Sequence, residues 1–345
     1  MTIDLFVEQL LLPPEQESIY NSTTVFRNHH PITYLENYLM ELNSKILVTG
    51  HRGLLGSAVI RQLTAKGYAN ILTVSREQLD LTRQQAVENY VDGNRPEYVF
   101  HCAAKVTGIA ASTGGTSSLW NLQMQTNVID SAQRAGVKKF FFPGSNCCYP
   151  KFPKLPITED QLWTGRLEVT SDGYSSAKLA GIKLLENLDK QYRFPYVILM
   201  PCNLYGINDT FDPENAHVMA AMISKICDAK RNNTDVTFWG DGSALREFLF
   251  SDDAAIAAIH CMENEVEPFM NLASGNEMTL KKLAAMIKKT AGFTGKINWD
   301  TTKPTGTPRK GLDISKILAS GWKPTTELEI GIELAIEHYV KEVQQ

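Results

Sequence analysis

The stretch that decides the fold is Lys45-Ile46-Leu47-Val48-Thr49-Gly50-His51-Arg52-Gly53-Leu54-Leu55-Gly56. It begins with a short apolar run typical of a buried strand, and a helical pattern follows from Leu54 to Lys66. Glycines between a strand and a helix let the backbone approach a pyrophosphate, and the start of the helix supplies N–H donors and a positive dipole end. The stretch therefore predicts a dinucleotide site. Its expected lining residues are Gly50, Arg52, Gly53, Leu54, Leu55 and Gly56.

Strands and helices alternate outward from this stretch as far as about Pro201. Such alternation is typical of a parallel, doubly wound sheet, so the fold class is predicted to be α/β of the Rossmann type. After Pro201 the helical patterns are separated by loops rich in Gly, Asp and Pro, which indicates a smaller C-terminal α/β domain that holds the substrate. The expected strands are 46–48, 71–74, 98–101, 140–142 and 196–200. The expected helices are 54–66, 83–91, 122–135, 175–192, 217–230, 280–291 and 327–343.

Three parts are predicted along the chain. Residues 1–44 contain no glycine and form an N-terminal arm with one or two short helices, which we expect to dock on its own subunit or a dimer mate. The dinucleotide-binding domain covers 45–204, with a return segment at about 250–275. The substrate-binding domain is made of 205–249 and 276–345.

Composition excludes several classes of function. The chain has 345 residues, 43% of them hydrophobic, and a formal net charge of −4, which gives no electrostatic case for nucleic-acid binding. No apolar run is long enough to span a bilayer, and residues 1–25 lack the basic region of a signal peptide. The six cysteines have no disulfide or zinc spacing. We therefore expect a cytoplasmic protein without a metal site.

The end of the second expected strand indicates which dinucleotide is bound. NAD enzymes usually carry a carboxylate there for the ribose 2′-hydroxyl, but this chain has Arg76. The planar fork of a guanidinium suits a 2′-phosphate, and Arg52 can assist, so NADP(H) is favoured over NAD even though Glu77 is a neighbour. Asp80 can accept from the adenine. The segment expected to lie along the ribose and pyrophosphate is Ala103, Ala104 and Lys105.

A candidate hydride-transfer set consists of Ser145, Tyr174 and Lys178. The Tyr-x-x-x-Lys spacing occurs by chance about once in a chain of this composition, so its position decides its value. It opens a helix after the fourth expected strand. There Tyr174 can protonate a ketone, Lys178 can lower the pKa of Tyr174 and bind the nicotinamide ribose, and Ser145 can hydrogen-bond the substrate oxygen.

Cys147 is an unusual neighbour for a catalytic serine. A thiolate there can remove a proton next to a ketone, and His217, at the start of an expected helix, is the best partner among seven histidines. The alternatives are a small buried cysteine and a surface histidine. Spacing alone leaves the choice open.

Eight motifs follow one another along residues 45–343. They are Gly50-His51-Arg52-Gly53, Ala103-Ala104-Lys105-Val106, Gly144-Ser145-Asn146-Cys147-Cys148-Tyr149-Pro150, Tyr174-x-x-x-Lys178, Pro201-Cys202-Asn203-Leu204-Tyr205-Gly206, Asn215-Ala216-His217-Val218, Arg246-Glu247-Phe248 and Gly306-Thr307-Pro308-Arg309-Lys310. Taken together and in this order, the motifs resemble the GDP-L-fucose synthase family of the extended short-chain dehydrogenases.

The resemblance implies a role for each matching residue. Ser145, Tyr174 and Lys178 would be the reductase triad, and Cys147 and His217 the acid–base pair of epimerisation. A homodimer built on helices 121–135 and 175–192 is also implied. Further cofactor contacts would come from Pro201, Asn203, Leu204 and His217. The GDP-sugar site would be lined by Lys225, Trp239, Arg246, Arg309 and Asp313.

The implied reaction is 3,5-epimerisation and NADPH-dependent 4-reduction of GDP-4-keto-6-deoxy-D-mannose to GDP-L-fucose. One alternative is a reductase of a related GDP-4-keto sugar with single or no epimerisation, as in colitose-type pathways, because Asn146 and Thr107 replace smaller residues of many members. Another is an NADPH-binding regulatory protein, against which the intact Ser145, Tyr174 and Lys178 argue. A 4,6-dehydratase is disfavoured because such enzymes resemble one another in a Thr-Asp-Glu run, where this chain has Ser145-Asn146-Cys147.

Overall fold

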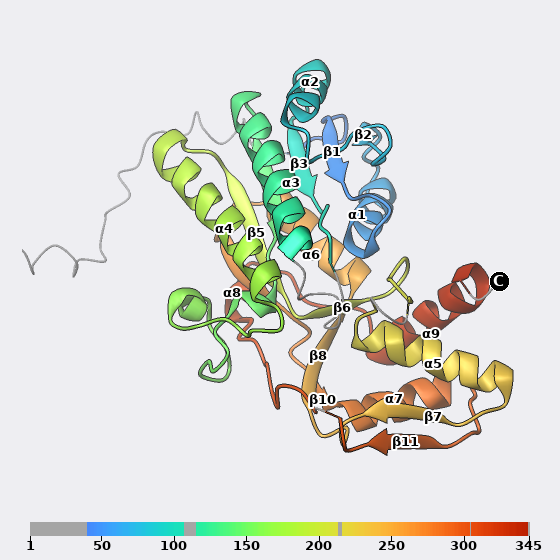
Figure 1. Cartoon of the computed structure of the whole chain (residues 1–345). Coiled ribbons are helices and arrows are strands. Elements are labelled where there is room, and N and C mark those ends of the chain that lie inside the picture. Colours follow the sequence, from blue (N-terminus) through green and yellow to red (C-terminus); the bar gives the residue numbers. More distant parts are fainter. Residues whose placement is uncertain (1–39, 107–114, 213–215, 304, 344–345) are drawn as a thin grey trace, which may run out of the picture. The chain divides into compact units, whose positions relative to one another are not determined.

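The computed structural model describes residues 40–106, 115–212, 216–303 and 305–343 (Figure 1). The helices expected in the arm lie outside these residues. At the end of the arm, the Met40 side chain packs in the main core, and the Tyr68 hydroxyl donates to the Met40 carbonyl at 3.0 Å. Among the described residues, no helix is long and apolar enough to cross a membrane.

A six-stranded parallel sheet forms the centre of the fold, in the order β2-β1-β3-β4-β5-β9. Every residue of β1 and β3 is buried, as expected for strands covered on both faces. This arrangement confirms the predicted Rossmann-type α/β class. The strands are β1 (Ile46–Thr49), β2 (Ile71–Thr73), β3 (Tyr98–His101), β4 (Lys139–Pro143), β5 (Tyr196–Pro201) and β9 (Phe269–Leu272).

Two groups of helices cover the sheet (Figure 1). In one group α1 packs on α6, and the Arg61 Nη2 lies 2.6 Å from the Asp252 Oδ2 across that contact. In the other group α2, α3 and α4 pack side by side. The helices are α1 (Leu54–Ala65), α2 (Gln84–Asn94), α3 (Gly115–Arg134), α4 (Asp172–Tyr192) and α6 (Ser251–Glu263).

Helix α3 begins at Gly115 and not near Leu122 as expected. Its first turns are rich in small polar residues and lack the apolar spacing that marks a helix in sequence. A contact with α4 supports them, because the Ser118 hydroxyl donates to the Gly173 carbonyl at 2.7 Å. The earlier start brings an additional part of α3 toward the sheet end that carries the glycine-rich turn.

The region after β5 contains strands that the sequence analysis did not predict. They form a three-stranded sheet in the order β10-β8-β6 and a two-stranded sheet of β11 and β7. Their short length gives little periodicity to detect. The strands are β6 (Asn203–Tyr205), β7 (Val236–Trp239), β8 (Leu245–Phe250), β10 (Glu277–Thr279) and β11 (Ile297–Asp300). The helices of this region are α5 (Val218–Asn232), α7 (Leu280–Thr290), α8 (Ser315–Ala319) and α9 (Leu328–His338).

Two hydrophobic cores underlie the two regions. The change from one to the other falls inside β6, where Leu204 packs against the first core and Tyr205 lies in the second. Leu312, Ile317 and Trp322 also lie in the first core. The segment around α8 thus contributes to the core of the large sheet, although the sequence analysis assigned it to the smaller domain.

Candidate active site

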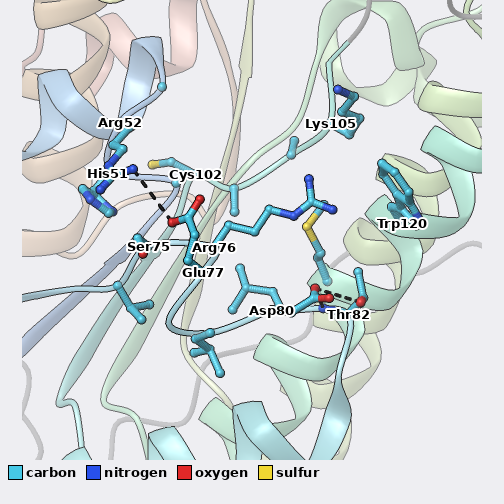
Figure 2. A pocket seen from close by; sticks show the side chains of 18 residues that line it. His51, Arg52, Ser75, Arg76, Glu77, Asp80, Thr82, Cys102, Lys105 and Trp120 are labelled. Carbon is cyan, nitrogen blue, oxygen red and sulfur yellow. Dashed lines mark hydrogen bonds and ion pairs between the residues drawn. The ribbon is translucent and has the colours of Figure 1, made fainter.

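A pocket of about 310 Å³ lies at the carboxyl ends of β1, β2 and β3 (Figure 2). In the sheet, β2 and β3 lie on opposite sides of β1, so the strand order reverses at β1. Doubly wound sheets bind ligands at such a reversal. Helix α3 supplies a further wall. The lining residues discussed below are Gly50, His51, Arg52, Gly53, Ser75, Arg76, Glu77, Asp80, Cys102, Ala103, Ala104, Lys105, Trp120 and Met124.

The glycine-rich turn fits a pyrophosphate. Gly50 has a φ of 70°, and a Cβ on it would lie 2.6 Å from the Ala103 nitrogen, so this position requires glycine. A Cβ on Gly56 would lie 2.1 Å from the Gly50 carbonyl oxygen. Gly53 is different, because a Cβ there would meet only an ordinary contact at 3.5 Å. Gly53 lines the pocket. No side chain caps the start of α1, so the first N–H groups of this helix are suited to binding phosphate oxygens.

Cationic and acidic side chains share the outer part of the pocket (Figure 2). Arg52 Nη1 lies 3.9 Å from Glu77 Oε2, and both side chains are exposed. Asp80 Oδ1 accepts from the backbone N–H and the hydroxyl of Thr82 at 3.0 and 2.8 Å. These two hydrogen bonds are the main reason that the pKa of Asp80 is lowered. Arg76 extends toward the centre of the pocket.

The remaining expected cofactor residues lie outside this lining. Leu54, Leu55 and Gly56 form the first turn of α1. Pro201 ends β5, and Asn203 in β6 donates its side-chain N–H to the Glu247 carbonyl at 2.9 Å. One pocket thus gathers eight of the expected cofactor residues, namely Gly50, Arg52, Gly53, Arg76, Asp80, Ala103, Ala104 and Lys105.

Ser145 and Cys147 follow β4 in a short 3₁₀ turn, Asn146–Cys148. The Ser145 hydroxyl accepts from the Cys147 backbone N–H at 3.1 Å and so fixes the turn. Cys147 is partly exposed, and its thiol donates to the Asn146 side-chain oxygen at 3.7 Å. Cys148 is fully buried, as a small core residue would be. The two neighbouring thiols therefore differ in access, and Cys147 is the one that a ligand can reach.

Tyr174 and Lys178 come from the first turns of α4, which packs on this turn. Burial raises the pKa of Tyr174, the charges of Cys148 and Cys147 raise it further, and a hydrogen bond with Ser145 lowers it in part. Lys178 is 2% exposed, donates to the Pro143 carbonyl at 2.9 Å and lies 4.5 Å from the Phe142 ring centre. Burial lowers the pKa of Lys178 to about 8.

The lowering of the Tyr174 pKa by Lys178 stays a prediction, because Lys178 has another hydrogen-bond partner in this structure. Its ammonium group is held by the Pro143 carbonyl, and burial dominates at Tyr174. The phenol is therefore protonated at neutral pH. A protonated phenol is the form that a proton donor to a ketone requires.

His217 immediately precedes α5, and Arg246 lies in β8. His217 is exposed, although partial loss of hydration lowers its pKa. Burial also lowers the pKa of Arg246, and attraction to the Cys147 thiol opposes that shift, so these two groups are close. In the described part of the chain, contacts link Ser145 with Cys147 and Tyr174, whereas no hydrogen bond joins Cys147 to His217.

The other expected substrate residues have partners of their own. Lys225 Nζ lies 6.0 Å from the Phe238 ring centre, and the exposed Trp239 ring lies 5.9 Å from Lys303 Nζ. Arg309 Nε donates to both carboxylate oxygens of Glu277, at 3.0 and 2.7 Å. Asp313 Oδ1 accepts from Ser315 at the start of α8. These residues are spread over β7, α5 and the segment before α8.

Asn271 in β9 joins two of the segments that carry candidate residues, the turn with Cys147 and the segment with Asp313, and sequence reasoning missed it. Its side-chain oxygen accepts from the Tyr149 hydroxyl at 2.6 Å. Its side-chain nitrogen donates to the Ile157 and Asp313 carbonyls at 2.8 and 3.0 Å, and its backbone N–H donates to Glu159 at 2.8 Å. The residue is fully buried. An isolated asparagine in an apolar strand of a long chain gave no signal beyond its polarity.

A family model described as NAD dependent epimerase/dehydratase family matches residues 46–273, from β1 to the end of β9. The chain therefore belongs to the NAD dependent epimerase/dehydratase family. Its cofactor is a nicotinamide adenine dinucleotide, and the pocket described above is the place in this chain that fits one.

Within that class, the chain is similar to proteins named for one sugar product. It is 46% identical over 314 residues to the putative GDP-L-fucose synthase 2 of Arabidopsis thaliana, which covers 90% of this chain and 95% of that protein. A GDP-L-fucose synthetase from Naegleria fowleri bound to NADP has a TM-score of 0.83 at 27% identity, covering 89% and 97% of the two chains. A GDP-mannoheptose C4 reductase from Campylobacter jejuni with NADP bound has a TM-score of 0.80 at 33% identity, covering 88% and 100%.

Proposed function

We propose that this protein converts GDP-4-keto-6-deoxy-D-mannose to GDP-L-fucose by 3,5-epimerisation followed by NADPH-dependent 4-reduction. The observation that carries the proposal is the accessible thiol of Cys147 beside the linked Ser145 and Tyr174. A plain ketone reductase has no use for a thiol at this place. The similarity to GDP-L-fucose synthases supports the same reaction.

In the epimerisation, Cys147 acts as a thiolate that removes a proton from a carbon next to the C4 ketone. His217 is our candidate for returning a proton on the opposite face. Ser145 and Tyr174 donate hydrogen bonds to O4 and so stabilise the charge that develops there. The guanidinium of Arg246 near Cys147 offsets negative charge on the same side.

In the reduction, NADPH supplies the hydride when it is bound. Tyr174 gives its proton to O4, and its raised pKa keeps that proton in place until the reaction needs it. Lys178 is our candidate for holding the cofactor ribose. Arg76 and Arg52 are proposed for the 2′-phosphate, Asp80 for the adenine, and Ala103, Ala104 and Lys105 for the ribose and pyrophosphate.

The GDP-sugar is proposed to lie between β8, α5 and the segment before α8. Arg246 and Lys225 are candidates for the diphosphate, and Trp239 for packing near the nucleotide. Arg309 and Asp313 complete the proposed lining. We also propose a homodimer through α3 and α4, whose exposed Leu119 and Tyr192 offer apolar contact area, and a cytoplasmic location.

The test is the reaction in D2O with GDP-4-keto-6-deoxy-D-mannose and NADPH, followed by NMR. Deuterium at both C3 and C5 together with NADPH oxidation is the expected result. Cys147→Ser should abolish exchange and keep residual ketone reduction, while the control Cys227→Ala, in the second core, should keep both activities. Equal loss of exchange and reduction in Cys147→Ser would contradict the proposed division of roles.

A second candidate is a reductase of a related GDP-4-keto sugar with single or no epimerisation. It is favoured by the contact between the Cys147 thiol and Asn146, a position where this chain departs from many GDP-L-fucose synthases, and by the similarity to a C4 reductase. Deuterium at one carbon or at neither, with NADPH oxidised, would establish it. Any NADPH turnover excludes a purely regulatory NADPH-binding protein.

A further inference from the structure

Arg76 and Trp120 approach each other inside the cofactor pocket (Figure 2). Arg76 follows the end of β2, and Trp120 lies in the early part of α3 that begins before the expected helix start. The guanidinium carbon of Arg76 is 5.2 Å from the centre of the Trp120 ring. This is a cation–π contact between two residues from different elements, both of which line the pocket.

Two carboxylates compete for Arg76. Glu77 is the next residue in the chain, and Asp80 lies on the same turn. The charge of Arg76 contributes, after hydrogen bonds from Thr82, to lowering the pKa of Asp80. It also contributes to lowering the pKa of Glu77, after a hydrogen bond with Ser75. In the described residues Glu77 is paired with Arg52 and Asp80 with Thr82 and Arg83, while the Arg76 guanidinium lies over the Trp120 ring.

The choice of partner decides how many donors Arg76 can offer. A guanidinium paired with a carboxylate uses part of its N–H fork, whereas one stacked on an aromatic ring keeps all its in-plane donors available. A free arginine also loses side-chain entropy when it is fixed in one conformation. Among the described residues no hydrogen bond uses the Arg76 guanidinium, so the contact with Trp120 orients Arg76 and leaves its donors available to bind a phosphate in a bidentate way.

We propose that Trp120 is a positioning residue that sets the cofactor preference of this enzyme. It holds Arg76 toward the adenosine 2′-phosphate and away from Glu77 and Asp80. The inference rests on the proposed use of NADP. It assigns the preference not to the arginine alone but to the arginine and the indole that supports it.

The test is equilibrium binding by calorimetry, which needs no sugar substrate. The probes are adenosine 2′,5′-bisphosphate and 5′-AMP, followed by NADPH and NADH. Trp120→Leu should weaken binding of adenosine 2′,5′-bisphosphate about fivefold, the size of one partly exposed cation–π contact, and should change 5′-AMP binding by less than about twofold. Trp120→Phe should restore most of the preference, because it keeps an aromatic face.

A matched control is Trp163→Leu. Trp163 carries a similar stack, with Lys183 Nζ 5.5 Å from its ring centre, but it lies outside the pocket lining. This variant should bind both probes as the parent does. If the parent prefers the 2′-phosphate and Trp120→Leu keeps that preference, the role of Trp120 is overturned.

Equal weakening of both probes by Trp120→Leu would also overturn the inference, since the indole would then be a plain wall of the pocket. A parent protein without any preference for the 2′-phosphate would instead overturn the proposed use of NADP and this inference with it. The two failures are therefore distinguishable from the same measurements.

Discussion

The two sides of the candidate active site are built in different ways. The cofactor side takes its lining from three neighbouring strand ends and the start of α3, all between residues 50 and 124. The candidate substrate residues come from four distant segments, around Cys147, His217, Arg246 and Arg309. On the cofactor side the contacts join neighbouring strand ends, as between Gly50 and Ala103. The substrate side depends on buried polar contacts that hold remote segments together, and Asn271 is the clearest of these.

The largest effect is expected where the two sides meet. Tyr174→Phe removes the proposed proton donor, and we expect kcat for NADPH oxidation to fall about 10²- to 10⁴-fold with cofactor affinity nearly unchanged. Stopped-flow kinetics and calorimetry measure the two quantities. Tyr192→Phe, at the exposed end of the same helix, is the control and should behave as the parent does. A loss of less than tenfold would remove Tyr174 from the reaction.

Asn271→Ala tests whether the substrate side depends on the buried hydrogen bonds of Asn271. The substitution leaves the Tyr149 hydroxyl and two carbonyls without their partner, so the free energy of unfolding in urea should fall by about 3 kcal/mol. The KM for the GDP-sugar should rise, while the Kd for NADPH stays within about twofold. Asn276→Ala, at an exposed site, is the control. A larger loss of NADPH affinity than of sugar affinity would break the contrast between the two sides.

Asp209 gives a pH-dependent test of the substrate side, in the loop between β6 and α5. Burial raises the pKa of Asp209 from 3.8 to about 7, and one of its carboxylate oxygens is buried without a hydrogen bond among the described residues. Between these pH values the folded protein keeps a proton that the unfolded chain releases, so this group lowers stability as the pH rises through that window.

Asp209→Asn cannot ionise and should therefore stabilise the fold by about 2 kcal/mol more at pH 8 than at pH 5. Urea unfolding at the two pH values measures the difference. Asp241→Asn, at an exposed turn, should show no such gain at pH 8. An equal effect of Asp209→Asn at both pH values would show that the Asp209 carboxylate is already ionised in the folded state.

The smallest effect is expected at the exposed pair of Arg309 and Glu277. Glu277→Gln frees the guanidinium for a ligand, but exposed ion pairs are weak, so KM for the GDP-sugar should change about threefold or less. Steady-state kinetics at low and high salt measures this change, which salt should reduce further. A tenfold rise in KM would mean that Glu277 itself contacts the substrate.

Five of the six strands of the large sheet could be predicted from the sequence, and the two at its centre, β1 and β3, are fully buried; β9 (Phe269–Leu272) was not predicted. An apolar run such as Tyr98-Val99-Phe100 can be recognised without knowing its neighbours. The strands of the smaller region could not be recognised in this way. In β7 buried and exposed residues alternate over four positions, and β8 joins a parallel neighbour to an antiparallel one. Pairings of this kind are fixed by contacts across the chain and not by a local pattern.

In the candidate site, too, residues with a local role could be predicted, and residues fixed by distant contacts could not. The turn around Gly50 and Gly53 and the arginine after β2 could be predicted because each function is local to one strand end. Trp120 could not, since it depends on where α3 begins and on which face lies over the pocket. Asn271 could not either, because its partners at Tyr149, Ile157 and Asp313 are far away in the sequence.

The position of β9 and α6 in the chain has a consequence for biosynthesis. Strand β5 pairs with β9, and α1 packs on α6, yet both later elements follow the part of the smaller region that begins after Pro201. While the ribosome makes that part, the nascent chain presents β5, with its buried Val197-Ile198-Leu199-Met200 run, as an unpaired strand edge. During this interval of translation the exposed edge of β5 is open to mispairing with other strands.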